Sequence, residues 1–141
     1  SGDPNNFNLN DCSTQRNLSE EGKKQAKSIG KFFIKNEIEI DKVLSSEWCR
    51  CKETAKIAFK DYTTKSFLNS FYSSKFAKNK DKQVKALREY IKNYKNNDNE
   101  NLVLVTHYVL ISEILNYGSS SGEIVVSDKN FNIIDTQEIP Y

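Results

Sequence analysis

Leu102-Val103-Leu104-Val105-Thr106-His107 is the stretch of sequence that decides the fold. Its first five residues are apolar or β-branched without a break, which is typical of a strand covered on both faces of a parallel sheet. His107 follows where this strand ends, and residues 108–117 are expected to form a short helix that Gly118 stops. In α/β proteins ligands bind at this edge of the sheet, and the N-terminus of the next helix favours an anion such as phosphate.

Strands and helices alternate along the rest of the chain. Further strands are predicted at 42–45, 123–127 and 131–138, and further helices at 19–36, 47–59 and 77–95. Residues 1–17, 66–76 and 96–101 are expected to be loops. The alternation predicts an α/β fold with a mostly parallel sheet and a terminal hairpin, in a single domain over residues 1–141.

The composition excludes several classes of protein. The 141 residues carry a net charge of +2, which does not call for a nucleic acid or an anionic membrane as partner. No apolar run approaches the roughly 20 residues of a membrane helix, and no signal peptide is visible. A lysine-rich stretch over 75–95 could be a nucleic-acid face, but its interspersed acidic residues favour a solvated helix.

Three cysteines, Cys12, Cys49 and Cys51, leave two interpretations open. They are reduced thiols, or Cys12 forms a disulfide with Cys49 or Cys51, which would imply an oxidising compartment. The tight Cys49-Arg50-Cys51 spacing does not fit the common zinc hairpins, and the chain has one histidine. We therefore expect no metal and no cofactor.

Three residues are candidates for chemistry. His107 at the end of the buried strand could be catalytic or a structural core histidine. Arg50, early in the second helix, could hold a phosphate with its two-pronged guanidinium or pair on the surface with Glu47 or Glu53. Arg16, in a loop rich in donors, could line an anion pocket or only support loop and cap hydrogen bonds.

Four segments in order resemble the motifs of histidine phosphatases of the phosphoglycerate-mutase-like superfamily. They are Gln15-Arg16-Asn17-Leu18-Ser19-Glu20-Glu21-Gly22 with Gln25-Ala26, Leu44-Ser45-Ser46-Glu47-Trp48-Cys49-Arg50-Cys51-Lys52-Glu53-Thr54-Ala55, Leu104-Val105-Thr106-His107 and Ser121-Gly122-Glu123-Ile124-Val125-Val126. The resemblance implies a three-layer α/β/α sandwich with a phosphate pocket at the carboxyl edge of a mostly parallel mixed sheet. Arg50 would bind the transferring phosphoryl group, His107 would donate to one of its oxygens, and Arg16 would help to hold it.

The activity that this resemblance implies is a phosphomonoesterase that forms a phosphohistidine intermediate. The substrate would be a phosphorylated small molecule or a phosphoprotein. Glu53 and Glu123 are candidates for the proton donor only because they lie near motifs. The alternative is a non-catalytic relative that binds a phosphorylated ligand or a partner protein. Relatives of this kind often carry secretion signals, which suggests a periplasmic or exported protein and otherwise a cytoplasmic one.

The sequence departs from the family in its histidines. The nucleophile belongs to an Arg-His-Gly or Arg-His-Ala motif that ends the family's first strand, whereas the single histidine here fits the late motif. Tyr108 and Val109 also replace the glycines that usually follow the late histidine. Since methionine is absent as well, we expect an N-terminally truncated domain that lacks the first strand and is inactive in this form.

A missing first strand has consequences for the sheet. In the family this strand lies between those matching residues 102–106 and 123–127, so we expect a gap, closure of these two strands, or filling by another segment. A distorted sheet that self-associates through its unpaired edges is favoured. We also expect a poorly anchored loop over 1–17, and Cys12 near Cys49 or Cys51, because residues 12–16 and 49–50 should flank one pocket.

Overall fold

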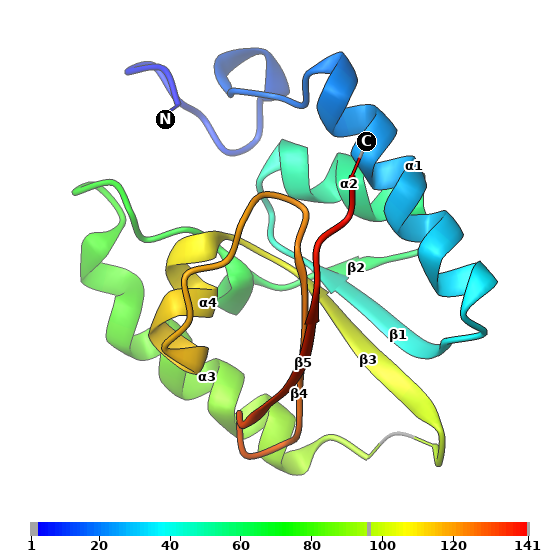
Figure 1. Cartoon of the computed structure of the whole chain (residues 1–141). Coiled ribbons are helices and arrows are strands. Elements are labelled where there is room, and N and C mark those ends of the chain that lie inside the picture. The colour runs from blue at the N-terminus through cyan, green and yellow to red at the C-terminus, as the bar shows by residue number, and fades with distance from the viewer. Residues whose placement is uncertain (1–2, 96, 141) are drawn as a thin grey trace.

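The computed structural model describes residues 3–95 and 97–140 and contains two separate sheets (Figure 1). Strands β1 (Glu39–Ser45), β2 (Thr63–Thr64) and β3 (Glu100–Val105) form a parallel sheet in the order β2-β1-β3. Strands β4 (Ile124–Ser127) and β5 (Ile133–Gln137) form an antiparallel hairpin. The predicted α/β fold, with parallel strands and a terminal hairpin, is confirmed.

Helices cover both faces of the parallel sheet. Helices α1 (Glu20–Lys35) and α2 (Cys49–Phe59) lie on one side of the strands, and α3 (Lys80–Asn93) and α4 (Tyr108–Leu115) lie on the other (Figure 1). Short 3-10 turns occupy Cys12–Thr14, Ser66–Leu68 and Ala77–Asn79. One core joins Leu44 of β1 to α3 and α4, and the other centres on Ile29 and Phe33 of α1. The arrangement has three layers, with apolar side chains of β3 contributing to both cores.

Close packing of α1 on α2 depends on one glycine. A Cβ atom built on Gly30 would lie 2.5 Å from the carbonyl oxygen of Ala58, a separation that atoms do not tolerate. The absence of a side chain at this position lets the two helices approach, so α2 and the arginine near its start are fixed against α1.

The boundaries of several elements differ from the predictions. Strand β1 starts at Glu39 rather than at residue 42, because Glu39 and Ile40 pair with Glu100 and Asn101. The first half of β1 is mostly charged, so the hydrophobicity pattern gives no sign of a strand there. Strand β2 was not predicted, since its two residues are both exposed threonines.

Strand β3 is less buried than its sequence predicts. Residues 102–106 are only partly buried, so the expectation of a strand covered on both faces is wrong in this detail. The reason is that β3 pairs with β1 on one edge, while its other edge faces a cleft of about 1370 Å³. Residues 122–127 line the opposite side of the cleft, so there is a gap between β3 and β4, the first of the three outcomes expected for this sheet.

The expectation of a poorly anchored loop over residues 1–17 is wrong for its described part. Cys12 is joined to Cys49 by a disulfide, which confirms that these thiols lie together. The ring of Phe7 packs on Trp48 with 5.1 Å between centroids. The carboxylate of Asp3 accepts a hydrogen bond from the backbone N–H of Arg16 at 3.0 Å. Covalent, aromatic and polar contacts therefore hold this loop against the start of α2.

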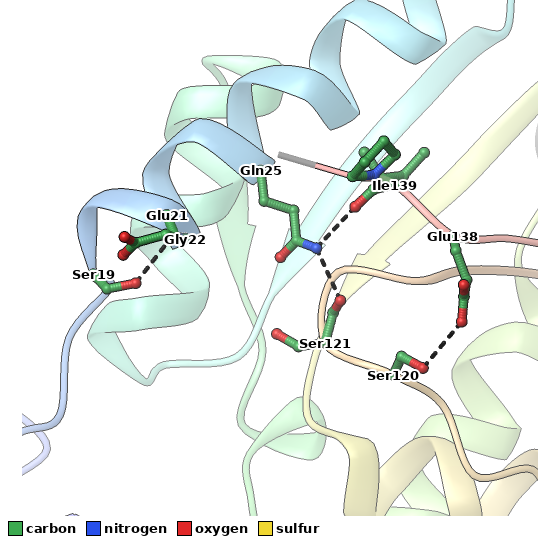
Figure 2. Close-up of a pocket in the computed structure, with 9 residues that line it drawn as sticks. Ser19, Glu21, Gly22, Gln25, Ser120, Ser121, Glu138 and Ile139 are labelled. Atoms are coloured by element: carbon green, nitrogen blue, oxygen red, sulfur yellow. Dashed lines mark hydrogen bonds between the residues drawn. The ribbon is translucent and has the colours of Figure 1, made fainter.

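The side chain of Gln25 in α1 bonds both ends of the hairpin (Figure 2). The amide nitrogen of Gln25 donates to the carbonyl oxygens of Ser121 at 3.0 Å and Ile139 at 2.9 Å. These carbonyls lie just before β4 and just after β5, so Gln25 holds both ends of the hairpin. Gly122 between them has a φ of +77°, and the Gln25 amide occupies the space that a Cβ atom would need.

We predict that Gln25→Ala loosens the hairpin without unfolding the parallel sheet. The substitution removes two hydrogen bonds worth about 1 kcal/mol each, so the backbone amides of β4 and β5 should exchange several-fold faster with deuterium. Lys27→Ala, at an exposed position of the same helix, is the control and should leave exchange unchanged. Equal exchange in the two variants would show that Gln25 does not hold the hairpin.

Candidate functional site

The pairing of β1 with β3 brings the candidate residues together. Ser45 is in register with Val105, and the backbone N–H of Ser46 continues the ladder by donating to the carbonyl oxygen of Val105 at 2.9 Å. Because the strands are parallel, the residues that follow them leave the sheet at the same edge. His107 is therefore beside Ser46, and α2 starts three residues after Ser46.

His107 is buried and makes polar contacts through both ring nitrogens, including one of 3.7 Å between Nε2 and the Sγ atom of Cys51. Its Nε2 atom lies 2.8 Å from the Ser46 hydroxyl, and its Nδ1 atom lies 3.4 Å from Nη2 of Arg50. A guanidinium can only donate, so Nδ1 is the acceptor of this pair and the ring proton is on Nε2. In this tautomer Nε2 of His107 donates to the Ser46 hydroxyl, and the lone pair of Nδ1 accepts from Arg50.

Burial keeps His107 neutral. Desolvation is the main cause, and the positive charge of Arg50 adds to it, so that the pKa falls from 6.5 to about 3. The nearby carboxylate of Asp3 opposes the shift but does not reverse it. At neutral pH the site therefore has one fixed cation, Arg50, beside an uncharged imidazole.

A network of hydrogen bonds fixes the Ser46 hydroxyl. Ser46 donates to Oδ1 of Asn69 at 3.2 Å and accepts from the backbone N–H of Trp48 at 3.1 Å. Oδ1 of Asn69 also accepts from the backbone N–H of Glu47 at 2.8 Å, and the amide nitrogen of Asn69 donates to the Glu47 carboxylate. The serine pair of the motif is thus held in place by a residue from a distant loop.

Asp3 holds Arg50 from the side opposite to His107. Nη1 of Arg50 lies 3.2 Å from Oδ1 of Asp3, and the Trp48 indole donates to Oδ2 of Asp3 at 3.2 Å. Burial alone would raise the pKa of Asp3, but the hydrogen bonds from the Arg16 backbone and from Trp48, with the charge of Arg50, lower it overall. Asp3 is therefore ionised and is the carboxylate that balances Arg50.

The three predicted site residues line one cleft but contribute in different ways. Arg50 and His107 are in contact, and Arg16 lines the same cleft. Arg16 contacts Asp3 through its backbone N–H, while its side chain is exposed. The roles of the three residues in binding and catalysis remain predictions.

The disulfide and the third cysteine are both close to this site. The bridge from Cys12 to Cys49 joins the N-terminal loop to the first turn of α2, directly before Arg50. The Gln15 side chain reinforces this junction by accepting a hydrogen bond from the backbone N–H of Cys49 at 2.9 Å. Cys51 is free and buried, and burial raises the pKa of its thiol to about 11, so it is protonated and unreactive.

Aromatic rings form one wall of the site. The Trp48 ring meets the His107 ring edge-on at 5.2 Å, and it also packs against Phe7 and Phe76. On the other side, the half-exposed ring of Tyr108 lies 6.4 Å from that of Tyr72. The Trp48 ring shields the imidazole from water, and the exposed rings of Tyr72 and Tyr108 add apolar surface to the cleft.

Asp3 is the part of the site that sequence reasoning missed. It stands in an irregular loop where no periodicity or motif points to a role, and 47 residues separate it from Arg50. Glu123, proposed from its proximity to a motif, instead accepts hydrogen bonds from Tyr117 and the Ser120 backbone next to β4. Glu53 lies on α2 beyond Arg50, and the carboxylate in contact with the guanidinium is that of Asp3.

Two further properties concern the described part of the chain. No group of three or more His, Cys, Asp or Glu residues in it is arranged to hold a metal ion. None of its helices has the length and apolar character needed to cross a bilayer.

Comparison with known families gives one match. Residues 10–69 match the model of the histidine phosphatase superfamily, branch 1, the family that the sequence motifs resemble. The matched residues include Arg16 and Arg50 and end before β3 and His107. No curated protein matches the chain.

We predict that protonation of His107 destabilises the fold in acid. Its pKa of about 3 in the folded state lies below the usual 6.5, so the unfolded chain binds this proton first as the pH falls below 6.5. The free energy of unfolding should therefore drop by about 2 kcal/mol more between pH 7 and 4.5 in the wild type than in His107→Gln. Urea unfolding at several pH values measures this difference, and parallel pH profiles would contradict the prediction.

Proposed function

We propose that this chain, whose residues 10–69 match the model of the histidine phosphatase superfamily, is a single phosphomonoesterase-type domain that binds a phosphoryl group at Arg50 and His107. The family supports a phosphatase-type function in general terms. The observation that carries the finer proposal is the contact of a guanidinium with a buried, neutral imidazole at the carboxyl edge of a parallel sheet. This combination offers a fixed positive charge and a polar ring to the oxygens of a phosphate ester.

Arg50 would bind the phosphoryl group and neutralise its charge. Nη2 of Arg50 now faces Nδ1 of His107, and a phosphoryl oxygen would take the place of that acceptor. Nη1 would stay with Asp3, which keeps the guanidinium oriented. The same carboxylate weakens the field of Arg50, so a phosphate dianion must compete with Asp3 for the cation.

Ser46 would allow His107 to become a donor. In the free site the imidazole carries its proton on Nε2, so Nδ1 cannot donate to an anion. A hydroxyl can both donate and accept, so Ser46 could turn its proton toward Nε2 while the ring takes the tautomer protonated on Nδ1. His107 would then donate from Nδ1 to a phosphoryl oxygen without acquiring a net charge.

The nucleophile would be a second imidazole from a segment outside these 141 residues, because the chain has a single histidine and it is engaged with Ser46 and Arg50. Attack would form a nitrogen–phosphorus bond and break the ester bond, releasing the alcohol. Water would then break the nitrogen–phosphorus bond and release inorganic phosphate. On its own, the chain would bind phosphate without turning over an ester.

The second candidate function is a phosphate-binding relative without catalysis. The burial of His107 and its hydrogen bond to Ser46 favour this reading, since a buried and neutral ring is also what a structural role requires. The two functions differ in the need for a second imidazole.

The same site supports a proposal for the substrates and for the location of the protein. Phosphorylated small molecules and phosphoproteins are both proposed substrates, and the rings of Trp48 and Tyr108 favour an apolar group near the phosphate. The disulfide between Cys12 and Cys49 supports an oxidising compartment, and we propose a periplasmic or exported protein.

We predict that Arg50→Ala weakens the binding of inorganic phosphate about tenfold or more, because a hydrogen bond to a charged group contributes about 1.5–3 kcal/mol. Isothermal titration of the chain at pH 7 measures the affinity. Arg88→Ala is the matched control: Arg88 lies on α3 over the Phe131 ring, and its loss should leave the affinity unchanged. An equal loss of phosphate affinity in both variants would show that only the net charge of the protein matters, and this result would contradict the proposed site.

We also predict that the 141-residue chain hydrolyses an aryl phosphate at a negligible rate. A version extended at its N-terminus by a segment that carries an Arg-His-Gly or Arg-His-Ala motif should be active, and its histidine-to-asparagine variant should not. Substantial turnover by the short chain would mean that His107 is itself the nucleophile. Inactivity of the extended version, with phosphate binding retained, would favour the non-catalytic relative.

A further inference from the structure

Two largely exposed tyrosine rings lie beside each other in the cleft that Arg50 and His107 line. Tyr72 is 67% exposed and Tyr108 is 58% exposed, and their ring centroids are 6.4 Å apart with 49° between the ring planes. Both tyrosines line the same cleft as the arginine and the histidine. Aromatic rings that stay in water beside a polar site offer apolar surface that a bound ligand can cover.

The position of Tyr108 is set by His107. Tyr108 follows His107 directly and is the first residue of α4, whose N-cap is His107 itself. The carbonyl oxygen of His107 accepts from the backbone N–H groups of Leu110 and Ile111, both at 3.1 Å, so the first turn of the helix is bonded to the histidine. The Tyr108 side chain therefore starts from the residue next to the imidazole that is proposed to bind the phosphoryl group.

The segment that carries Tyr72 is fixed to the site at both ends. At one end Asn69 accepts a hydrogen bond from the Ser46 hydroxyl at 3.2 Å, and at the other end the Phe76 ring packs on Trp48 with 5.2 Å between centroids. Both Ser46 and Trp48 also contact the imidazole of the site. Tyr72 lies between these two anchors, so its ring belongs to the wall of the site.

The chemistry of these rings favours one kind of ester group. Aromatic rings pair with other aromatic rings in offset or edge-on contacts, at about 4.5–7 Å between centroids. The hydroxyls of a sugar or glycerol group would lose hydrogen bonds to water without gaining equal partners on a ring face. In a phenyl ester the ring is bonded to the ester oxygen itself, so a phosphoryl group at Arg50 and His107 brings that ring close to Tyr108.

The acid–base state of the site favours the same leaving group. Although burial opposes it, hydrogen bonds from the Arg16 backbone and Trp48 and the charge of Arg50 keep the pKa of Asp3 low, so Asp3 has no proton to donate at neutral pH. A phenol has a pKa of about 10, so its oxygen leaves with less help from an acid than an aliphatic alkoxide needs. As the nitrogen–phosphorus bond of the proposed mechanism forms, the electron pair of the breaking phosphorus–oxygen bond stays on the phenolate oxygen, which water then protonates.

We propose that Tyr72 and Tyr108 are specificity residues that select phosphate monoesters of phenols, the class that contains phosphotyrosine and small aryl phosphates. The two rings contact the aromatic leaving group, while Arg50 and His107 hold the phosphoryl group. This inference rests on the proposed function, because without a phosphoryl site the rings have no ester to select.

The probes are phenyl phosphate and cyclohexyl phosphate, which share the phosphoryl group and a ring of the same size but differ in aromaticity. Isothermal titration at about pH 8 compares them as dianions, since the second pKa of a phosphate ester is about 6. We expect the 141-residue chain to bind phenyl phosphate about three- to tenfold more tightly, because an aromatic pair is more favourable than its buried area alone.

A capped phosphotyrosine, titrated in the same way, identifies the source of the aryl ester. Tighter binding than that of phenyl phosphate would assign the site to phosphoproteins, because the peptide groups then add contacts. Equal or weaker binding would assign it to small aryl phosphates. Both results support the selection of an aromatic ester when phenyl phosphate is preferred over cyclohexyl phosphate.

Substitutions of the two tyrosines test the location. Tyr72→Leu and Tyr108→Leu remove a ring but keep an apolar side chain, so the two esters should bind more nearly equally. Tyr108→Phe keeps the ring and should keep the preference. Tyr62→Leu is the matched control, because Tyr62 lies between α2 and β2 and outside the lining of the cleft. Both Tyr72 and Tyr108 are largely exposed, so we expect the variants to fold, which circular dichroism checks.

Four outcomes would overturn the inference. Equal binding of phenyl and cyclohexyl phosphate, with inorganic phosphate still bound, would contradict the role of the rings and leave the proposed function intact. A preference that survives in both leucine variants would assign it to other rings. Binding of phenyl phosphate that is unchanged in Arg50→Ala would show that the ring adsorbs elsewhere. If neither inorganic phosphate nor either ester binds, the proposed function fails and the inference fails with it.

Discussion

The parallel pairing of β1 with β3 is the constraint on which the site depends. It sets Ser45 beside Val105, and the next hydrogen bond, from Ser46 N–H to Val105 C=O, fixes where both chains leave the sheet. A shift of one residue would turn the Ser46 side chain to the opposite face and separate its hydroxyl from Nε2 of His107. The contact between Arg50 and His107 follows, since α2 begins from this point and Gly30 fixes its distance from α1.

The charges of the site are arranged around this contact. Arg50 lies between a carboxylate and an imidazole. At neutral pH His107 is uncharged and Asp3 is ionised, so the positive charge of Arg50 is balanced by the carboxylate alone. A positive charge on His107 would lie beside the guanidinium in a partly dehydrated place, which is why burial and Arg50 act in the same direction on its pKa. The loop that supplies Asp3 is held by the Cys12–Cys49 bridge, so the charge balance depends on a covalent link formed near α2.

Sequence reasoning could identify the elements with strong periodicity and the residues that lie at the ends of strands. His107 and Arg50 were found because each follows an apolar strand, and Cys12 because it lies in the same motif neighbourhood as Cys49. Asp3 could not be found, since its role depends on the path of a loop that has no repeating pattern. The partial burial of β3 could not be predicted from the sequence either. Its apolar residues are typical of a strand with neighbours on both edges, but burial depends on which neighbours are present.

The cleft beside β3 links the unpaired edges to the properties of the site. Val105 and Thr106 lie at its rim, and the same opening reaches Trp48 and His107. Water in the cleft screens Arg50, because charges exposed to solvent interact weakly. On the other side, the packed rings of Trp48, Phe7 and Phe76 keep water away from the site. The solvent exposure of the guanidinium therefore sets how strongly Arg50 attracts an anion.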